Sequence, residues 1–486
     1  MKGSLVWLSS GICFALISVH HVFWLLLIPA FVCLLYVFEQ VKNWRQVFWL
    51  CWFVGTMSAF GGYSFVWETY PLTWIDIGSP VVQLAFIFSY WLTTSAAMGL
   101  GPVIPGLLIY RLYQWRPIYA ALAFPLAWVM GEILGSLFSS IILLGPGSYL
   151  NINIAHGYTG LALSHLALLF PFIKIGGVYA LSFLAALLGL ISYLILVRKN
   201  ISAWSLLVFA FVLLTIYLIF PPQLPPTTNT KVLAVDLNFS SAEWHQPGGP
   251  VLKQKLVQEA TFQALKSDSD IILLSEDARL TKGLGGPTTT LAFLQKWAPE
   301  QDTLVVESSR ITDETGKAVL RGYYYDLAKG TVYEIDKQFL VPQGEYVTYL
   351  YSWIIKMIVP DEVYQNLQRD VNYRPGPKDK LEDLPKNIPA LMFCFDNSSV
   401  FGAYNIKTFK DNPIILHSVS HSWFHQPVIY WDQLKGMLRT QSIWNQTIIV
   451  KAGNMSPSRT YLPNGQIIEG ELKAKTRYWS IVEYQL

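Results

Sequence analysis

The first 220 residues carry very few charged side chains, and this constrains the fold more than any other feature of the chain. The whole chain has 486 residues, of which 52% are hydrophobic and only 14% are charged. Successive apolar segments long enough to cross a bilayer as helices are typical of a membrane protein. Residues 230–486 have the charge content of a soluble domain. The sequence therefore predicts a membrane part followed by a water-facing part.

The membrane part contains seven candidate spans. The first two are short and meet at His20 and His21, as in a tight hairpin, and no clear signal-peptide cleavage site precedes them. A proline-rich linker over 221–229 separates a helical bundle over 1–220 from a second domain over 230–486. The candidate spans cover approximately residues 5–20, 22–38, 47–67, 82–110, 117–137, 175–197 and 202–220.

Basic residues recur in every second connection between the spans, which predicts an orientation. Because Lys and Arg are retained on the cytoplasmic side, these connections are expected to be cytoplasmic. An odd number of spans then places the second domain on the outer side. The net charge of +3 is too small and too scattered to indicate nucleic-acid binding. The basic residues concerned are Lys2, Lys42, Arg45, Arg111, Arg116, Arg198 and Lys199.

The second domain alternates strand-like and helix-like segments, which indicates an α/β layered fold with a substantial sheet. The clearest helical patterns lie over 251–267 and near 431–441. Strands are expected over 231–238, 270–276, 302–308, 322–325, 331–333, 389–393, 413–420 and 447–452.

Three side chains with complementary chemistry lie at or near the ends of these strands. Glu276 and Cys394 each follow a buried strand, so both could lie at one sheet edge. A glutamate can accept a thiol proton, a thiolate can attack a carbonyl, and the ammonium of Lys337 can stabilise the oxyanion. Taken alone, each residue has an ordinary structural interpretation: Cys394 as a small buried hydrophobe and Lys337 as a solvated surface cation.

These residues resemble the Glu-Lys-Cys triad of the nitrilase superfamily. The element Leu340-Val341-Pro342-x-Gly344-Glu345-Tyr346, together with the membrane bundle, is similar to the apolipoprotein N-acyltransferases of bacteria. The resemblance implies an α-β-β-α sandwich on the periplasmic side of the inner membrane. It covers nearly the whole chain.

The resemblance also implies a reaction. Cys394 would take an acyl chain from a phospholipid as a thioester and pass it to the α-amino group of a diacylglyceryl-cysteine lipoprotein. Glu276 would be the general base, Lys337 would stabilise the oxyanion, and Glu345 would orient the lysine. No metal or other cofactor is expected, and we expect a monomer.

The chain departs from the family pattern in four places. It has Asp396 where a glutamate is usual, and His421-Ser422 where Asn-Asp is common. It lacks an arginine soon after Glu132, and it lacks the final membrane span that the family often has.

Two alternative functions remain open. The same triad with water as acceptor would make a membrane-anchored amidase. The departures at Asp396 and His421 are compatible with a non-catalytic protein that binds lipoproteins. A membrane bundle favours the acyltransferase over the amidase, because a small soluble amide needs no bundle.

Residues 346–359 form a short, strongly apolar and aromatic segment directly after Glu345. The segment is too short to span a bilayer, so we expect an arm at the membrane interface that carries Tyr346, Tyr349 and Trp353, with Trp423 nearby. The alternative is a core helix of the outer domain.

Polar residues elsewhere allow two further interpretations. His417, His421 and His425 are spaced by four, which on a helix would align three zinc ligands, but the preceding residues read as a strand. Glu132 lies within the fifth span, where a carboxylate either bonds between helices or lies near a substrate path. The apolar loop 138–174 is expected on the outer membrane surface.

Overall fold

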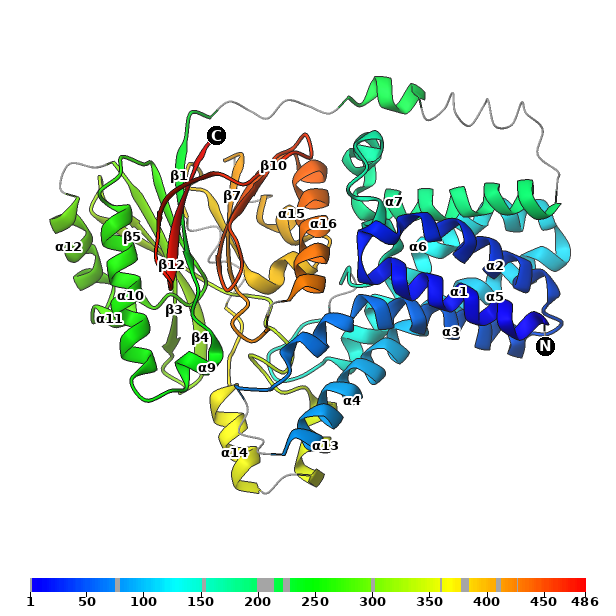
Figure 1. The fold of residues 1–486 in the computed structure, drawn as a ribbon, viewed down its shortest axis with the longest axis horizontal. Helices are drawn as coiled ribbons and strands as arrows, with labels where there is room; N and C mark the ends of the chain where they lie inside the picture. The colour runs from blue at the N-terminus through cyan, green and yellow to red at the C-terminus, as the bar shows by residue number, and fades with distance from the viewer. Residues whose placement is uncertain are drawn as a thin grey trace.

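A computed structural model of the chain describes residues 2–74, 79–150, 154–198, 214–221, 228–298, 302–358, 361–376, 384–407, 412–425 and 427–486. A helical bundle and a sheet-containing part lie side by side (Figure 1). The N-terminus lies at the end of the bundle that is farthest from the sheet, and α16 lies between the sheet and the bundle helix α7.

The bundle is built from long apolar helices joined by short turns. Four stretches in the described residues are long and apolar enough to cross a membrane: His21–Gln40, Pro80–Trp115, Pro117–Ile142 and Ala167–Arg198. The helices are α1 (Lys2–Val19), α2 (Leu27–Gln40), α3 (Trp44–Gly62), α4 (Pro80–Gly99), α5 (Val103–Trp115), α6 (Pro117–Ile142) and α7 (Phe170–Tyr193), with shorter turns η1 (His21–Leu26), η2 (Ser64–Thr69), η3 (Thr159–Leu163), η4 (Ala167–Leu169) and the π-turn η5 (Leu194–Arg198).

The predicted span over 82–110 is not one continuous helix. It is divided into α4 and α5, because Pro102 has no backbone N–H and the chain turns at Leu100-Gly101. A Cβ on Gly101 would lie only 2.2 Å from the carbonyl oxygen of Gly131, so the absence of a side chain allows α5 to approach α6. Most of the predicted span over 202–220 and of the linker over 221–229 lies outside the described residues.

Glu132 bonds within the bundle. One carboxylate oxygen accepts hydrogen bonds from the Thr159 backbone N–H and hydroxyl, both at 2.8 Å, and from the Trp128 indole at 3.2 Å. These contacts tie α6 to η3, the turn that precedes α7. They favour the interpretation of Glu132 as a hydrogen-bonding group between helices, because buried carboxylates need such partners.

Within the described residues, twelve strands form one continuous sheet. Neighbouring strands follow the order β11-β12-β1-β2-β3-β4-β5 in one half and β6-β7-β8-β9-β10 in the other, and a single pair, Leu237 with Asn454, joins the halves. The strands are β1 (Lys231–Leu237), β2 (Ile271–Leu274), β3 (Leu304–Thr312), β4 (Ala318–Asp326), β5 (Thr331–Asp336), β6 (Ala390–Phe393), β7 (Ile414–Ser420), β8 (Ile448–Asn454), β9 (Arg459–Tyr461), β10 (Ile467–Ile468), β11 (Glu471–Lys475) and β12 (Trp479–Gln485).

The two halves of the sheet share an apolar core. Alternate residues of each strand point to opposite faces, so one face of β1 and β2 packs with one face of β6, β7 and β8. Residues in this shared core include Ala234, Leu273, Leu391, Leu416 and Val450. The sheet therefore curls so that the carboxyl ends of strands far apart in the sequence come close together.

Helices cover the outer faces of the curled sheet. α10 (Gly249–Ala264) packs on β1 and β2, and α16 (Val428–Asn445) packs on β6, β7 and β8. On its other side α16 contacts the bundle helix α7, so the two parts share a packed interface (Figure 1). The remaining helices are α9 (Ser241–Trp244), α11 (Leu280–Gly283), α12 (Pro287–Trp297), α13 (Tyr349–Ile358), α14 (Asp361–Asp370) and α15 (Gly402–Lys407).

Candidate active site

Cys394 stands where β6 ends and a short 3-10 turn, η7 (Cys394–Ser398), begins. The strand residues before it are fully buried, which fixes the thiol at the carboxyl end of the strand. Its sulfur lies 3.8 Å from the backbone oxygen of Ser420, at the end of the neighbouring strand β7. The thiol is 7% exposed and lines a cavity.

Glu276 follows β2 and reaches the same cavity from the other half of the sheet. Its backbone N–H donates to the carbonyl of Val419 on β7, which links the two sheet halves at this point. Its carboxylate accepts a hydrogen bond of 2.9 Å from the Lys337 ammonium. The curl of the sheet therefore brings a carboxylate from one half close to a thiol from the other.

Lys337 is held between two carboxylates. It follows β5, and its ammonium, with a side chain only 1% exposed, bonds Glu276 at 2.9 Å and Glu345 at 2.7 Å. The second oxygen of Glu345 accepts the Val341 backbone N–H at 2.8 Å. Gly344 is required in this turn, because a Cβ there would lie 1.8 Å from the ring of Trp423. Glu345 thus fixes the position of the lysine.

Burial and neighbouring charges set the protonation of the three groups. Burial raises the pKa of Glu276 to about 7, although the Lys337 ammonium opposes this effect. Burial acts to lower the pKa of Lys337, but the two carboxylates outweigh it and raise that pKa well above its ordinary value. Burial, and then the charge of Glu276, raise the pKa of the Cys394 thiol. The resting site therefore pairs a neutral thiol with a permanently charged ammonium, and the carboxylate titrates near neutrality.

The cavity has a volume of about 500 Å³ and lies between the bundle and the sheet part. The bundle contributes aromatic side chains such as Tyr63, Phe65 and Phe86, and the sheet part contributes the three polar groups described above. A volume of this size and an aromatic wall are typical of sites that take an organic ligand. A long apolar chain could therefore lie against the aromatic wall with its carbonyl at Cys394.

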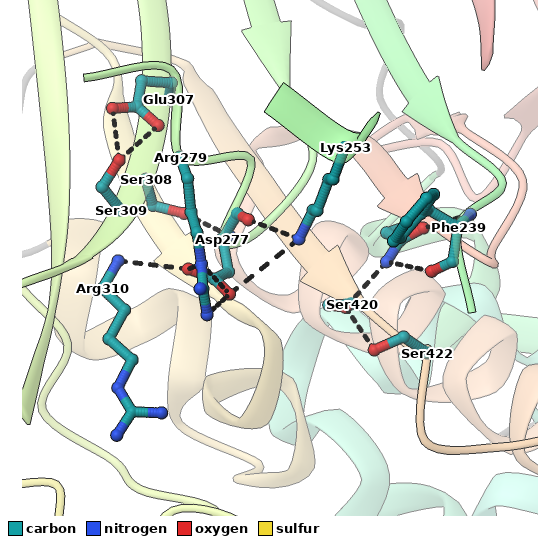
Figure 2. Close-up of polar contacts among 11 residues, drawn as sticks. Phe239, Lys253, Asp277, Arg279, Glu307, Ser308, Ser309, Arg310, Ser420 and Ser422 are labelled. Atoms are coloured by element: carbon teal, nitrogen blue, oxygen red, sulfur yellow. Dashed lines mark hydrogen bonds and ion pairs between the residues drawn. The ribbon is translucent and has the colours of Figure 1, made fainter. Parts of the chain in front are cut away.

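A second wall of the cavity carries a cluster of charges, shown in Figure 2. The Arg279 Nε–H donates to both carboxylate oxygens of Asp277, each at 2.8 Å, and the Lys253 ammonium donates to the Asp277 carbonyl at 2.8 Å. The Arg310 backbone N–H donates to the same carboxylate, while its guanidinium lies 4.7 Å from the Tyr373 ring. Lys253 and Arg279 contact Asp277, whereas the Arg310 guanidinium points away from that carboxylate (Figure 2). The wall therefore carries three cations and one carboxylate, which suits an anionic group.

The sequence did not indicate this wall. Asp277 and Arg279 have φ angles of 54° and 64°, so the turn after Glu276 is left-handed at two residues that are not glycine. That turn directs the arginine across the Trp244 ring, at 4.1 Å from its centroid. The only available signal was the position of Asp277 and Arg279 directly after a strand that ends in a carboxylate.

The supporting residues of the sequence analysis occupy different places. Asp396 is buried in the turn that begins at Cys394, and one of its carboxylate oxygens accepts a hydrogen bond of 2.8 Å from the Phe393 backbone N–H. Burial raises its pKa to about 7. Trp423 lines the cavity and stacks on Trp74 of the bundle side, with ring centroids 5.8 Å apart.

Tyr346, predicted as part of an interfacial arm, does not lie on the exposed face of the 346–359 segment. Its side chain is 5% exposed and its hydroxyl donates to the carbonyl of Leu143 at 2.8 Å, because Gly145 leaves room for the ring. The apolar segment instead becomes α13, which buries Tyr351 against the bundle. Tyr349 and Trp353 lie on its opposite face and are 63% and 62% exposed.

The three histidines spaced by four do not converge. His417 lies on β7, where residues four apart on an extended strand are roughly 13 Å apart. His417 bonds the Met392 carbonyl and Asn397, His421 accepts from the Trp431 indole, and His425 bonds the Pro71 carbonyl. Each imidazole therefore has its own structural partner.

No family profile matches this chain, and no curated protein matches it. Solved structures similar to it include a cysteine-to-alanine mutant of a nitrilase-superfamily amidase from Nesterenkonia (12% identity, 54% of this chain and 92% of that chain, TM-score 0.35). Another is an amidase from Nesterenkonia sp. (12%, 53% and 91%, TM-score 0.34). A third is a carbon-nitrogen hydrolase from Helicobacter pylori (12%, 53% and 90%, TM-score 0.34). At this identity and TM-score, these similarities say nothing of activity.

Proposed function

We propose that the chain is a membrane-bound N-acyltransferase that moves an acyl chain from a phospholipid to the N-terminal amine of a diacylglyceryl-cysteine lipoprotein. The observation that supports this most is the meeting of Glu276, Lys337 and Cys394 at one cavity shared with an apolar bundle. The resemblance of these residues to the nitrilase triad, and of the 340–346 element to the N-acyltransferases, supports the same reaction. A hydrolase of small soluble amides would not need the aromatic bundle wall.

In the proposed first step, Glu276 takes the thiol proton as the Cys394 sulfur attacks the ester carbonyl of the phospholipid. The Lys337 ammonium stabilises the oxyanion, and the ester C–O bond breaks as Glu276 returns the proton to the lysolipid oxygen. In the second step the lipoprotein amine attacks the thioester and Glu276 accepts a proton from the amine. The C–S bond then breaks, and Glu276 returns the proton to the sulfur of Cys394, which restores the thiol. Glu345 keeps its bond to the ammonium throughout and positions it.

The charge distribution of the bundle supports an outer location for the sheet part. Arg198 pairs with Glu39 at 2.7 Å and bonds Tyr113, so the ends of α2, α5 and α7 meet at the end of the bundle far from the sheet. Lys42, Arg45, Arg111 and Arg116 adjoin these helix ends in the sequence. By the positive-inside rule this end is cytoplasmic, and the sheet part is then periplasmic on a bacterial inner membrane. Tyr349 and Trp353 would rest in the membrane interface.

The decisive experiment is mass analysis of the purified chain in two stages. Incubation with a defined phospholipid is expected to add one acyl mass at Cys394, and a later chase with a diacylglyceryl-cysteine peptide is expected to move that mass to the peptide amine. Release of free fatty acid without amine acylation would indicate the amidase alternative. Absence of any adduct with every phospholipid offered would indicate the non-catalytic binding protein.

The pKa of Glu276 sets the expected pH dependence. Only the ionised carboxylate can take the thiol proton, so kcat/KM is expected to fall about tenfold per pH unit below about 7 and to level off above it. The Asp396→Asn variant is the control, because Asp396 has a pKa raised into the same range. Loss of the acid limb in Asp396→Asn, or a flat profile from pH 5 to 9, would contradict the assignment of Glu276 as base.

The charged wall of Figure 2 is proposed to hold the phosphate of the acyl donor. The variant Arg310→Gln removes one of its cations and keeps a polar side chain. KM for the phospholipid is expected to rise about tenfold with kcat within about threefold, since the lost contact is made equally in the ground and transition states. Lys317→Gln, on an exposed turn, is the matched control. An unchanged KM in Arg310→Gln would exclude this role.

A further inference from the structure

A second, smaller cavity lies where the bundle meets α16. It has a volume of about 140 Å³ and is separate from the catalytic cavity. Its walls come from the turn between α1 and η1, from the loop around η3, and from one face of α16. The polar side chains that line it include His20, His21, His165, Asp432, Lys435 and Arg439.

The charges in this cavity are unevenly paired. Both oxygens of Asp432 are engaged by His21, one by the ring Nδ1 at 2.5 Å and the other by the backbone N–H at 3.0 Å. Among the described residues Arg439 has no ion pair, and its buried Nε has no hydrogen-bond partner. Lys435, one turn away on α16, likewise forms no ion pair within the described part of the chain. Two cations therefore face a cavity whose one carboxylate is already occupied.

A guanidinium whose buried Nε has no anion and no hydrogen-bond partner is costly, which favours a bound ligand in this cavity. His165 also lines the cavity, and its ring lies 4.8 Å from that of His21. His20, His21 and Asp432 also place donor atoms within 4.8 Å of one another, as a metal site would. A divalent cation would, however, be repelled by Arg439 and Lys435. The charge balance favours an anion.

The position of the cavity indicates the source of that anion. It lies at the sheet-facing end of the bundle, beside exposed apolar side chains of η1 and η4: Val22 at 62%, Leu25 at 58% and Leu168 at 69%. A lipid could place its chains against these residues. A volume of about 140 Å³ is too small for a whole lipid but has room for a head-group phosphate.

We propose that this cavity binds a phosphate group, with Arg439 and Lys435 as the cations that recognise it and His165 as an additional hydrogen-bond donor. A lipid head group and a free phosphate ion share this chemistry. The site does not depend on the reaction at Cys394, and it lies outside the catalytic cavity.

The test uses the full chain, delipidated in detergent, with two probes: phosphatidylglycerol counted by native mass spectrometry, and inorganic phosphate followed by thermal unfolding. Arg439→Gln is expected to weaken binding of the effective probe about tenfold or more, and Lys435→Gln about three- to tenfold. Arg111→Gln, which removes a charge at the far end of the bundle, is expected to change binding less than twofold. Binding of the lipid alone identifies a head group, and protection by inorganic phosphate identifies a free ion.

Binding that is unchanged in both Arg439→Gln and Lys435→Gln would overturn the proposal. So would stabilisation of the wild-type chain by Zn²⁺ with no effect of either phosphate probe. If Arg439→Gln does not fold, Lys435→Gln provides the test, and unchanged binding in that variant alone then overturns the proposal. No acyl acceptor is present in these measurements, so a negative result leaves the proposed acyl transfer untouched.

Discussion

A chain carrying Cys394→Ala is expected to transfer no acyl chain and to form no thioester. The expected loss is on the order of 10⁴-fold or more, since a covalent mechanism without its nucleophile retains only what binding and the oxyanion stabiliser provide. The substitution removes one sulfur atom from a buried position and leaves the Lys337 ion pairs unchanged. The measurement is acylation of a diacylglyceryl-cysteine peptide with phospholipid as donor.

Cys13→Ala is the matched control, because Cys13 lies in α1 within the bundle and away from the cavity. It should retain full activity. Transfer by Cys394→Ala at a rate close to that of the wild-type chain would show that the acyl chain never reaches this sulfur. The proposed mechanism would then have to be abandoned, whereas the phosphate site at Arg439 would be unaffected.

Strand ends were predictable from the sequence because buried strands read as short apolar runs. The runs before Glu276 and Cys394 mark β2 and β6 to within a few residues. The sequence pattern could not predict that Glu276 and Cys394 lie close together, because β2 and β6 belong to different halves of the sheet. Only the curl of the sheet, with Leu273 and Leu391 in one core, brings those ends together. That packing depends on long-range contacts that a local pattern does not contain.

The apolar runs predicted where the membrane helices lie, but they did not predict where a helix is interrupted or which side chains contact the bundle. Pro102 ends a run that hydropathy alone treats as continuous. Tyr346 reads as apolar and interfacial in a window of aromatic residues, yet its hydroxyl finds a backbone carbonyl in the bundle. Hydropathy averages cannot show that the Tyr346 ring faces a glycine while Tyr349 and Trp353 face outward.

The polar contacts of the site were the least predictable. The charged wall depends on left-handed φ angles at Asp277 and Arg279, for which these residue types give only a weak preference. The cations of the second cavity gave no signal at all, since Asp432, Lys435 and Arg439 have the spacing of an ordinary polar helix face. Their significance follows only from the pairing of Asp432 with a histidine more than 400 residues earlier.

Lys337→Met is expected to reduce both activity and stability. Loss of the ammonium removes the oxyanion stabiliser, which costs about 10²–10³-fold in kcat. It also leaves Glu276 and Glu345 buried without a cation, which costs about 3–5 kcal/mol of folding free energy when both are ionised. Activity is measured by peptide acylation, and stability by thermal unfolding in detergent.

The stability loss in Lys337→Met should itself depend on pH. Buried carboxylates without a cation have pKa values above those of the unfolded chain, so the deficit is small at low pH and grows as pH rises above the unfolded value. Lys329→Met is the control, because Lys329 is 56% exposed and solvent screens its pair with Asp326, so its loss should change the stability little at either pH. A deficit in Lys337→Met that is equal at pH 5 and pH 8 would mean that the two carboxylates do not depend on this ammonium. The lysine would then have no part in setting the charge of the proposed base.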